Sequence, residues 1–263
     1  MIRALFTAST GMIAQQMNVD TIANNLANVN TTGFKKSRVN FQDLMYETIK
    51  PAGTETTAGT TIPEGIQIGH GVRPSAIAKL FTQGNFIQTG NPYDLVIEGD
   101  GFFQVELPDG TIAYTRDGSF KVNQDGIVMT ADGYPLSPTV TVPTDAEQVT
   151  VGSDGTISAT VPGNATPQAI ATLQLVRFSN PAGLDSRMGR NLLLESEASG
   201  TPTTSEPGLD GVGLIEQGFV ENSNVQVVEE ILHLIIAQRA YEANSKIIQA
   251  SDEMLQLANN VRR

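Results

Sequence analysis

The chain has 263 residues and carries 16 Lys and Arg against 28 Asp and Glu, which gives a formal net charge of −12. Such an acidic chain should repel nucleic acid and anionic lipid, because both are bound through basic side chains. With no cysteine and two histidines, the sequence excludes disulfides and thiolate metal sites, and it has no recognisable catalytic, metal-ligating or cofactor-binding pattern. We therefore expect a protein that is not an enzyme and that uses no cofactor.

Residues 1–30 have a helical pattern that repeats every seven residues, and the repeating positions are Leu5, Met12, Val19 and Leu26. A seven-residue repeat keeps one stripe of a helix facing a partner, so it predicts a left-handed coiled coil. Asn is frequent here although it is a mediocre helix former, notably at Asn24, Asn25 and Asn28. We interpret these side chains as hydrogen bonding between helices, which would fix their register. The alternative is a two-helix stalk on its own β-domain, with solvated Asn side chains.

Residues 51–221 are rich in Gly, Pro and Thr and indicate strands joined by turns. Seven Asp-Gly pairs occur in this region, beginning at residues 100, 109, 117, 125, 132, 154 and 210. Asp-Gly supplies the positive φ angles that tight hairpin turns require. Short strand-like runs lie between the pairs, namely FFQVEL, TIAYT, SFKV and IVMT. The spacing predicts an antiparallel meander or a small sandwich.

The last segment repeats the pattern of the first, with apolar or aromatic residues every seven positions at Val227, Leu234, Tyr241, Ile248 and Leu255. We therefore predict a second helix that pairs with the first. Both helices carry more apolar surface than one two-stranded seam can bury, because additional Ile, Leu and Phe residues flank the stripes. This surplus predicts further packing partners.

The predicted fold class is α+β, with N- and C-terminal helices forming a coiled-coil domain and a central, mainly antiparallel β-domain. The expected boundaries are an N-terminal helix at 1–45, an extended linker at 46–75, the β-rich domain at 76–215 and a C-terminal helix at 216–263. No run approaches the roughly 18 apolar residues of a transmembrane helix, so we expect no membrane insertion. The N-terminus also lacks the apolar region of a cleavable signal peptide.

Two long terminal runs, at residues 8–49 and 222–256, resemble the signatures of the flagellar rod and hook family of axial proteins. Among the matching positions are Thr31, Gly33, Phe34 and Lys35 in the first run and Gln238, Arg239, Ala240, Glu242 and Asn244 in the second. Segments of the middle, including IQIGHGV and TADGYPL, resemble the distal-rod branch of that family. The resemblance covers nearly the whole chain and is weakest around residues 140–215.

The resemblance implies a structural subunit of the distal rod, a stiff hollow drive shaft that transmits torque through the periplasmic and outer-membrane rings. It implies an inner domain made of the terminal helices, and contacts from about residues 46–70 to neighbouring subunits. The implied partners are further copies of the chain in a helical homopolymer, proximal rod and hook subunits, the P and L rings, and the flagellar export apparatus. The implied location is the periplasm-spanning basal body of the bacterial flagellum, reached by type III export without signal cleavage.

Three other readings stay open at this point. One is a proximal rod subunit of similar length, and another is a secreted binding module on a coiled-coil stalk, which would form small oligomers. The third is a carbohydrate-active enzyme, because carboxylate pairs that are distant in sequence meet only in three dimensions.

Overall fold

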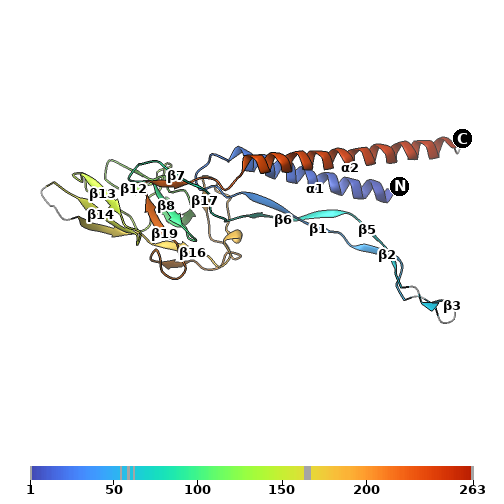
Figure 1. Cartoon of the computed structure of the whole chain (residues 1–263), viewed down its shortest axis with the longest axis horizontal. Helices are drawn as coiled ribbons and strands as arrows, with labels where there is room; N and C mark the ends of the chain where they lie inside the picture. The colour runs from blue at the N-terminus through green and yellow to red at the C-terminus, as the bar shows by residue number, and fades with distance from the viewer. Residues whose placement is uncertain (1, 54, 58–59, 62, 163–166, 262–263) are drawn as a thin grey trace. The chain divides into compact units, whose positions relative to one another are not determined.

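A computed structural model of the chain describes residues 2–53, 55–57, 60–61, 63–162 and 167–261 (Figure 1). It divides into two compact units, and each is assembled from separate stretches of sequence. The first, called the helical unit, comprises Met1–Ala27, Ser37–Lys79 and Gln226–Arg263. The second, called the β unit, comprises Asn28–Lys36 and Leu80–Val225.

The helical unit is built on two long antiparallel helices, α1 (Ile2–Ala27) and α2 (Val227–Val261), which lie side by side in Figure 1. Most of the buried and half-buried positions of α2 follow the alternating four- and three-residue spacing of a coiled-coil seam, with one gap at the exposed Tyr241; they are Glu230, Leu234, Ala237, Asn244, Ile248, Ser251 and Leu255. Ala240 and Ser245 are half-buried outside this spacing. The predicted pairing of the two terminal helices is therefore confirmed.

A two-stranded ribbon completes the helical unit. Strand β1 (Ser37–Asp43) pairs with β6 (Val72–Lys79), and α1 contacts both of these strands. Further along, β2 (Tyr46–Lys50) pairs with β5 (Ile66–Gly69) and β3 (Glu55–Thr57) pairs with β4 (Thr60–Thr61), all antiparallel. Figure 1 shows the ribbon leading away from the helices.

Two of the sequence-based boundaries are corrected by these elements. The first helix ends at Ala27 and does not reach residue 45, because Asn, Thr and a left-handed Gly33 (φ 67°) follow and β1 begins at Ser37. Most of the expected linker at 46–75 is extended, but it is paired into the ribbon. Residues 54, 58, 59 and 62 of that segment lie outside the described residues.

The β unit consists of short antiparallel strands. They are β7 (Phe86–Gln88), β8 (Leu95–Glu98), β9 (Phe103–Glu106), β10 (Ile112–Thr115), β11 (Lys121–Val122), β12 (Val128–Met129), β13 (Gln148–Val151), β14 (Thr156–Thr160), β15 (Gln168–Thr172), β16 (Leu175–Arg177), β17 (Leu192–Leu193), β18 (Thr203–Ser205), β19 (Leu214–Gln217) and β20 (Phe219–Glu221), with one 3₁₀ turn at Pro181–Gly183. The four strand-like runs expected around the Asp-Gly pairs become β9, β10, β11 and β12. The predicted antiparallel β-domain is confirmed.

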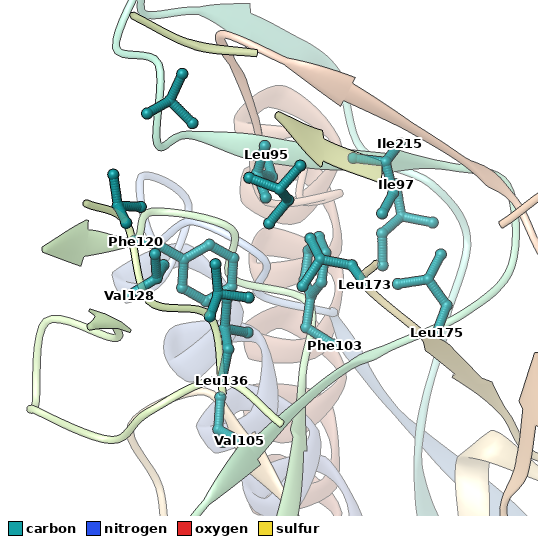
Figure 2. Close-up of a cluster of buried hydrophobic side chains, with 14 of the residues drawn as sticks. Leu95, Ile97, Phe103, Val105, Phe120, Val128, Leu136, Leu173, Leu175 and Ile215 are labelled. Atoms are coloured by element: carbon teal, nitrogen blue, oxygen red, sulfur yellow. The ribbon is translucent and has the colours of Figure 1, made fainter. Parts of the chain in front are cut away.

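The core of the β unit gathers apolar side chains from the early strands and from the last ones (Figure 2). The rings of Phe103 and Phe120 meet edge to face with their centroids 5.2 Å apart, and both residues are 1% exposed. Ile215 of β19 enters the same cluster opposite Ile97 of β8, with which it pairs. The C-terminal strands are therefore part of this core.

This core explains the remaining corrections to the expected boundaries. The β unit extends to Val225 and includes residues 28–36, whereas 76–215 was expected. The C-terminal helix begins at Val227 and not at residue 216, because residues 214–221 form β19 and β20. Neither described helix has a segment long and apolar enough for a membrane span.

Candidate assembly surface and chain junction

Most of the predicted heptad residues are partly covered in the folded chain. Seven of the nine are half-buried, namely Leu5, Met12, Val19 and Leu26 in α1 and Leu234, Ile248 and Leu255 in α2. The other two, Val227 and Tyr241, remain exposed by 41% and 42%. The fold of one chain therefore covers part of the predicted stripe and leaves the rest exposed.

Asn25 is the predicted asparagine that the structure places in a buried hydrogen-bond network. Its side chain accepts a hydrogen bond from the Ser37 backbone N–H and donates one to the Ser37 carbonyl, both at 2.9 Å. The same Nδ2 also donates to Oε2 of Glu230 in α2, at 3.2 Å. Asn25 thus ties α1 to both β1 and α2. Such a polar contact fixes register, because a shift of one residue would leave buried groups unpaired.

The other two predicted asparagines have different surroundings. Asn24 lies on the exposed side of α1, and Asn28 accepts a hydrogen bond from the Thr31 hydroxyl in the turn that follows the helix.

Asn244 of α2 is a second polar position between the helices. Its side chain lies against Gly11 of α1, where an added Cβ would fall 2.8 Å from Nδ2. Glycine costs helix stability at an interior position, so its presence needs a packing reason. The reason here is the room that Asn244 requires.

Both helices present large apolar side chains that the partner helix does not cover. The exposed set comprises Ile2, Phe6, Ile13 and Met17 in α1 and Val228, Ile231, Leu232, Ile235, Ile236, Ile247, Met254 and Leu257 in α2. Ile236, for example, is 64% exposed. An apolar surface of this extent is typical of an interaction site. We call it the outer helical face.

The motif residues of α2 lie mainly toward solvent. Gln238 is exposed, Ala240 is half-buried, and Arg239 forms an exposed ion pair with Glu242 at 3.8 Å. A pair of this kind contributes little to stability in water, since both side chains are solvated. These residues are consequently available at the surface of the subunit.

The N-terminal motif residues lie in the β unit, and one of them, Lys35, is a buried lysine. Nζ of Lys35 donates to Oε1 of Glu221 at 2.6 Å and to the Thr82 carbonyl at 2.8 Å. Nε of Arg116 lies 3.3 Å from the other oxygen of Glu221, and all three side chains are almost fully buried. Burial lowers the pKa of Lys35, and the charge of Glu221 opposes that shift. Burial likewise lowers the pKa of Arg116, again opposed by Glu221.

The segment that leads to Lys35 contains the other N-terminal motif residues, Thr31, Gly33 and Phe34. The N–H of Phe34 donates to the Thr31 carbonyl at 3.3 Å, and the N–H of Gly33 donates to the Glu221 carbonyl at 2.8 Å. A Cβ on Gly33 would lie 2.6 Å from the Asp117 nitrogen, and its φ of 67° suits glycine. The close approach and the backbone conformation together explain this glycine.

Asn224 was part of the resembling C-terminal run, but no structural role for it followed from the sequence. Its Oδ1 accepts from the N–H of Lys36 at 2.7 Å, and its Nδ2 donates to the Leu80 carbonyl at 2.8 Å. The side chain thus joins two segments that are distant in sequence. We call the set Lys35, Lys36, Leu80, Arg116, Glu221 and Asn224 the chain junction.

Within the described residues, no group of three or more His, Asp or Glu side chains is placed to hold a metal ion. A cavity of about 260 Å³ in the β unit is walled by Phe81, Phe102, Phe178 and two arginines. Its described lining includes one carboxylate residue, Asp100, whereas glycoside hydrolysis ordinarily uses two.

Comparison with known proteins identifies the family. Residues 5–35 match the model described as flagella basal body rod protein, residues 96–159 that of the flagellar hook protein FlgE/F/G D1 domain, and residues 216–261 that of the flagellar basal body rod FlgEFG protein C-terminal region.

Similar proteins cover the whole chain. The flagellar basal-body rod protein FlgG of Buchnera aphidicola subsp. Schizaphis graminum is 50% identical over 256 residues, which is 97% of this chain and 98% of the relative. FlgG of Borreliella burgdorferi is 48% identical over 265 residues, and FlgG of Bacillus subtilis is 42% identical over 270 residues, each covering both chains fully. The chain therefore belongs to the flagellar rod and hook protein family, alongside the basal-body rod proteins FlgG.

Proposed function

We propose that this chain is a structural subunit of the distal rod of the bacterial flagellum, and that it polymerises with copies of itself. The observation that carries the proposal is the outer helical face, in a chain similar along its full length to basal-body rod proteins. Burying apolar surface is the main favourable term in association, so copies packed along this face would gain stability. The role is architectural, and it requires no bound cofactor.

The finer features of the proposal rest on the likeness of the chain to the flagellar rod and hook proteins. The terminal helices form the inner attachment between copies, and the β unit gives each subunit a second, rigid body. The rod transmits torque, joins proximal rod and hook subunits at its ends and turns within the P and L rings. The subunit reaches the periplasm-spanning basal body through the flagellar export apparatus, with its N-terminus uncleaved.

We also propose that the ribbon contacts neighbouring subunits and stiffens the rod. Its supporting features are the exposed apolar side chains of Met45, Tyr46, Ile49 and Ile66, of which Met45 is 84% exposed. A two-stranded ribbon is marginally stable alone, so it would gain from a packing partner. Deleting residues 51–65 should leave a rod that assembles but bends more easily under the electron microscope. Unchanged straightness would contradict this role.

Polymerisation is tested with the purified full-length chain at high concentration by electron microscopy. We expect thin tubes from the unmodified chain and discrete particles from Ile236→Glu, which places a charge on the outer helical face. The matched control is Ile236→Leu, which keeps the site apolar and should form tubes. Circular dichroism of both dilute variants should match the unmodified chain. Discrete particles from the unmodified chain, or tubes from Ile236→Glu, would contradict the proposal.

A further inference from the structure

The chain passes between its two units four times, after residues 27, 36, 79 and 225. Connections between compact units are the usual place of hinge motion, because a few residues there absorb changes in φ and ψ. A drive shaft has to limit such motion. The β-unit ends of three of these connections are Lys36, Leu80 and Val225. The chain junction contains Lys36, Leu80 and Asn224, which directly precedes Val225.

Lys36, Leu80 and Asn224 form a closed triangle of hydrogen bonds. The N–H of Leu80 donates to the Lys36 carbonyl at 2.9 Å, and the N–H of Lys36 donates to Oδ1 of Asn224 at 2.7 Å. Nδ2 of Asn224 then donates to the Leu80 carbonyl at 2.8 Å. Each of the three residues is therefore bonded to both of the others.

An asparagine side chain suits this position because it carries an acceptor and a donor on one carbon. Nδ2 also lies 2.9 Å from the Thr82 hydroxyl, which anchors the side chain further along the second segment. Replacement by aspartate would keep an acceptor for Lys36 and remove the donor to Leu80. Replacement by alanine would remove both.

The buried charges hold the same segments from the inside. Lys35 directly precedes Lys36, and Glu221 precedes Asn224 by three residues. Nζ of Lys35 lies 2.6 Å from Oε1 of Glu221. Oε1 of Glu221 also accepts from the N–H of Gly84 at 2.8 Å, so the segment that contains Leu80 is bound to the same carboxylate. A Cβ on Gly84 would lie 2.0 Å from the Asn222 carbonyl oxygen, which shows how closely the two backbones approach.

We propose that Asn224 is a positioning residue that clamps three of the four connections together, so that they move as one when the subunit is loaded. This inference rests on the proposed role in the rod. The clamp lies wholly within the β unit. The clamp distributes over all three connections a load that arrives through one of them. It also prevents each connection from bending independently.

Hydrogen exchange on the unmodified full-length chain gives the first test. The Lys36 and Leu80 amides should open together, with the same opening equilibrium across a series of low urea concentrations. Opening equilibria that differ by more than about tenfold, the scale of one hydrogen bond, would overturn the clamp.

Substitution gives the second test. Asn224→Ala should accelerate exchange of both amides by about tenfold or more, although Leu80 donates to Lys36 and not to Asn224. The Phe102 amide, which donates to the Val176 carbonyl, should be unchanged. The matched control is Asn180→Ala, which removes a side-chain hydrogen bond to the Ala198 carbonyl elsewhere in the β unit and should leave both junction amides unaffected. Faster exchange at Lys36 alone would show that Asn224 affects only the amide it binds directly, and it would overturn the proposal.

The functional readout is motor torque in cells whose rods contain the variant. Cells with Asn224→Ala should build rods and rotate at low viscous load, but they should lose speed more steeply than Asn180→Ala cells as load rises. Equal torque-speed curves would overturn the clamp while leaving the rod assignment intact. Failure of the unmodified chain to form tubes would instead contradict the proposed function.

Discussion

Asn25 in α1 donates a hydrogen bond to Glu230 in α2 at 3.2 Å, across a separation of 205 residues in the sequence. The same side chain forms a two-way pair with the Ser37 backbone. One amide therefore holds the first helix, the last helix and the start of the ribbon in a single register.

Replacing this amide should weaken the helical unit. Asn25→Ala leaves the Ser37 N–H and carbonyl without their partner, and an unsatisfied buried polar group costs about 1–3 kcal/mol. We expect the free energy of unfolding to fall by about 2–3 kcal/mol, measured by urea titration of the helical circular dichroism signal. Gln16→Ala on the exposed side of α1 is the control and should change stability by less than about 0.5 kcal/mol. Equal effects of both changes would remove the special role of Asn25.

The carboxylate of Glu221 should be the most sensitive single group in the β unit. Glu221→Gln leaves Lys35 and Arg116 buried without this counter-ion, and breaking a buried pair in this way typically costs about 3–5 kcal/mol. Arg187→Gln breaks the exposed Arg187–Asp185 pair and should cost less than about 1 kcal/mol. Urea unfolding followed by tyrosine fluorescence compares the two variants. A loss for Glu221→Gln no larger than for Arg187→Gln would show that the buried charges are not coupled.

Comparing substitutions at Gly33 and Gly110 separates the cost of backbone strain from the cost of close packing. Both have positive φ, 67° and 79°, but a Cβ on Gly110 would meet nothing within 4 Å, whereas one on Gly33 would press on the Asp117 nitrogen. Gly110→Ala should cost about 1–2 kcal/mol from strain alone. Gly33→Ala should cost about 1–3 kcal/mol more, because the backbone must move apart. Thermal unfolding of the two variants measures the difference, and equal melting temperatures would contradict the packing argument.

The turn between β13 and β14 predicts a measurable pH effect. Asp154 accepts hydrogen bonds from the Thr156 hydroxyl at 2.6 Å and from the Thr156 N–H at 3.0 Å, and these donors hold the pKa of its carboxyl below the ordinary 3.8. The folded chain then binds fewer protons than the unfolded chain, so this stability is present above pH 3.8 and is lost as the pH falls through the folded pKa.

Thr156→Val removes the hydroxyl donor and keeps the backbone donor. The pKa of Asp154 should therefore rise toward 3.8, and the stability lost on acidification should shrink. Carboxyl ¹³C chemical shifts during an acid titration measure the pKa directly. Thr160→Val on the same strand is the control and should leave the Asp154 titration unchanged. A fall or no change in the Thr156→Val variant would contradict the assigned cause.

The sequence was most informative where a feature repeats or where backbone geometry demands one residue type. The heptad positions from Leu5 to Leu26 predicted α1, and the Asp-Gly pairs predicted turns with positive φ at Gly110, Gly126 and Gly155. Gly118 was wrongly expected to share that conformation. Gly118 does not have a positive φ. Glycine is needed there because the backbone approaches closely, and a Cβ would lie 1.6 Å from the Leu95 carbonyl oxygen.

The chain junction could not be predicted from sequence in the same way. Lys35 and Glu221 meet across 186 residues, and nothing periodic connects them. Lys35 stood out only through its place in the terminal motif, and Lys is rarely buried unless it is paired. A buried ion pair therefore follows from the fold, after the strands have brought its members together. The predicted end of the first helix at residue 45 is wrong for the same reason. The segment after Ala27 is bound by residues that are distant in the sequence, such as Glu221 and Asn224.

Beyond the strands that contact α1, the paired strands of the ribbon form an arm whose length mutation could change. At Gly53, two residues before β3, an added Cβ would meet nothing within 4 Å. Lengthening a turn costs little closure entropy, and two residues added to each strand restore the alternation of faces. Mutation could thus extend or shorten the arm in increments of about 7 Å while the helices and the β core stay as they are. Gains and losses of short sequence blocks at this one place would be a simple means of matching the subunit to lattices of different spacing.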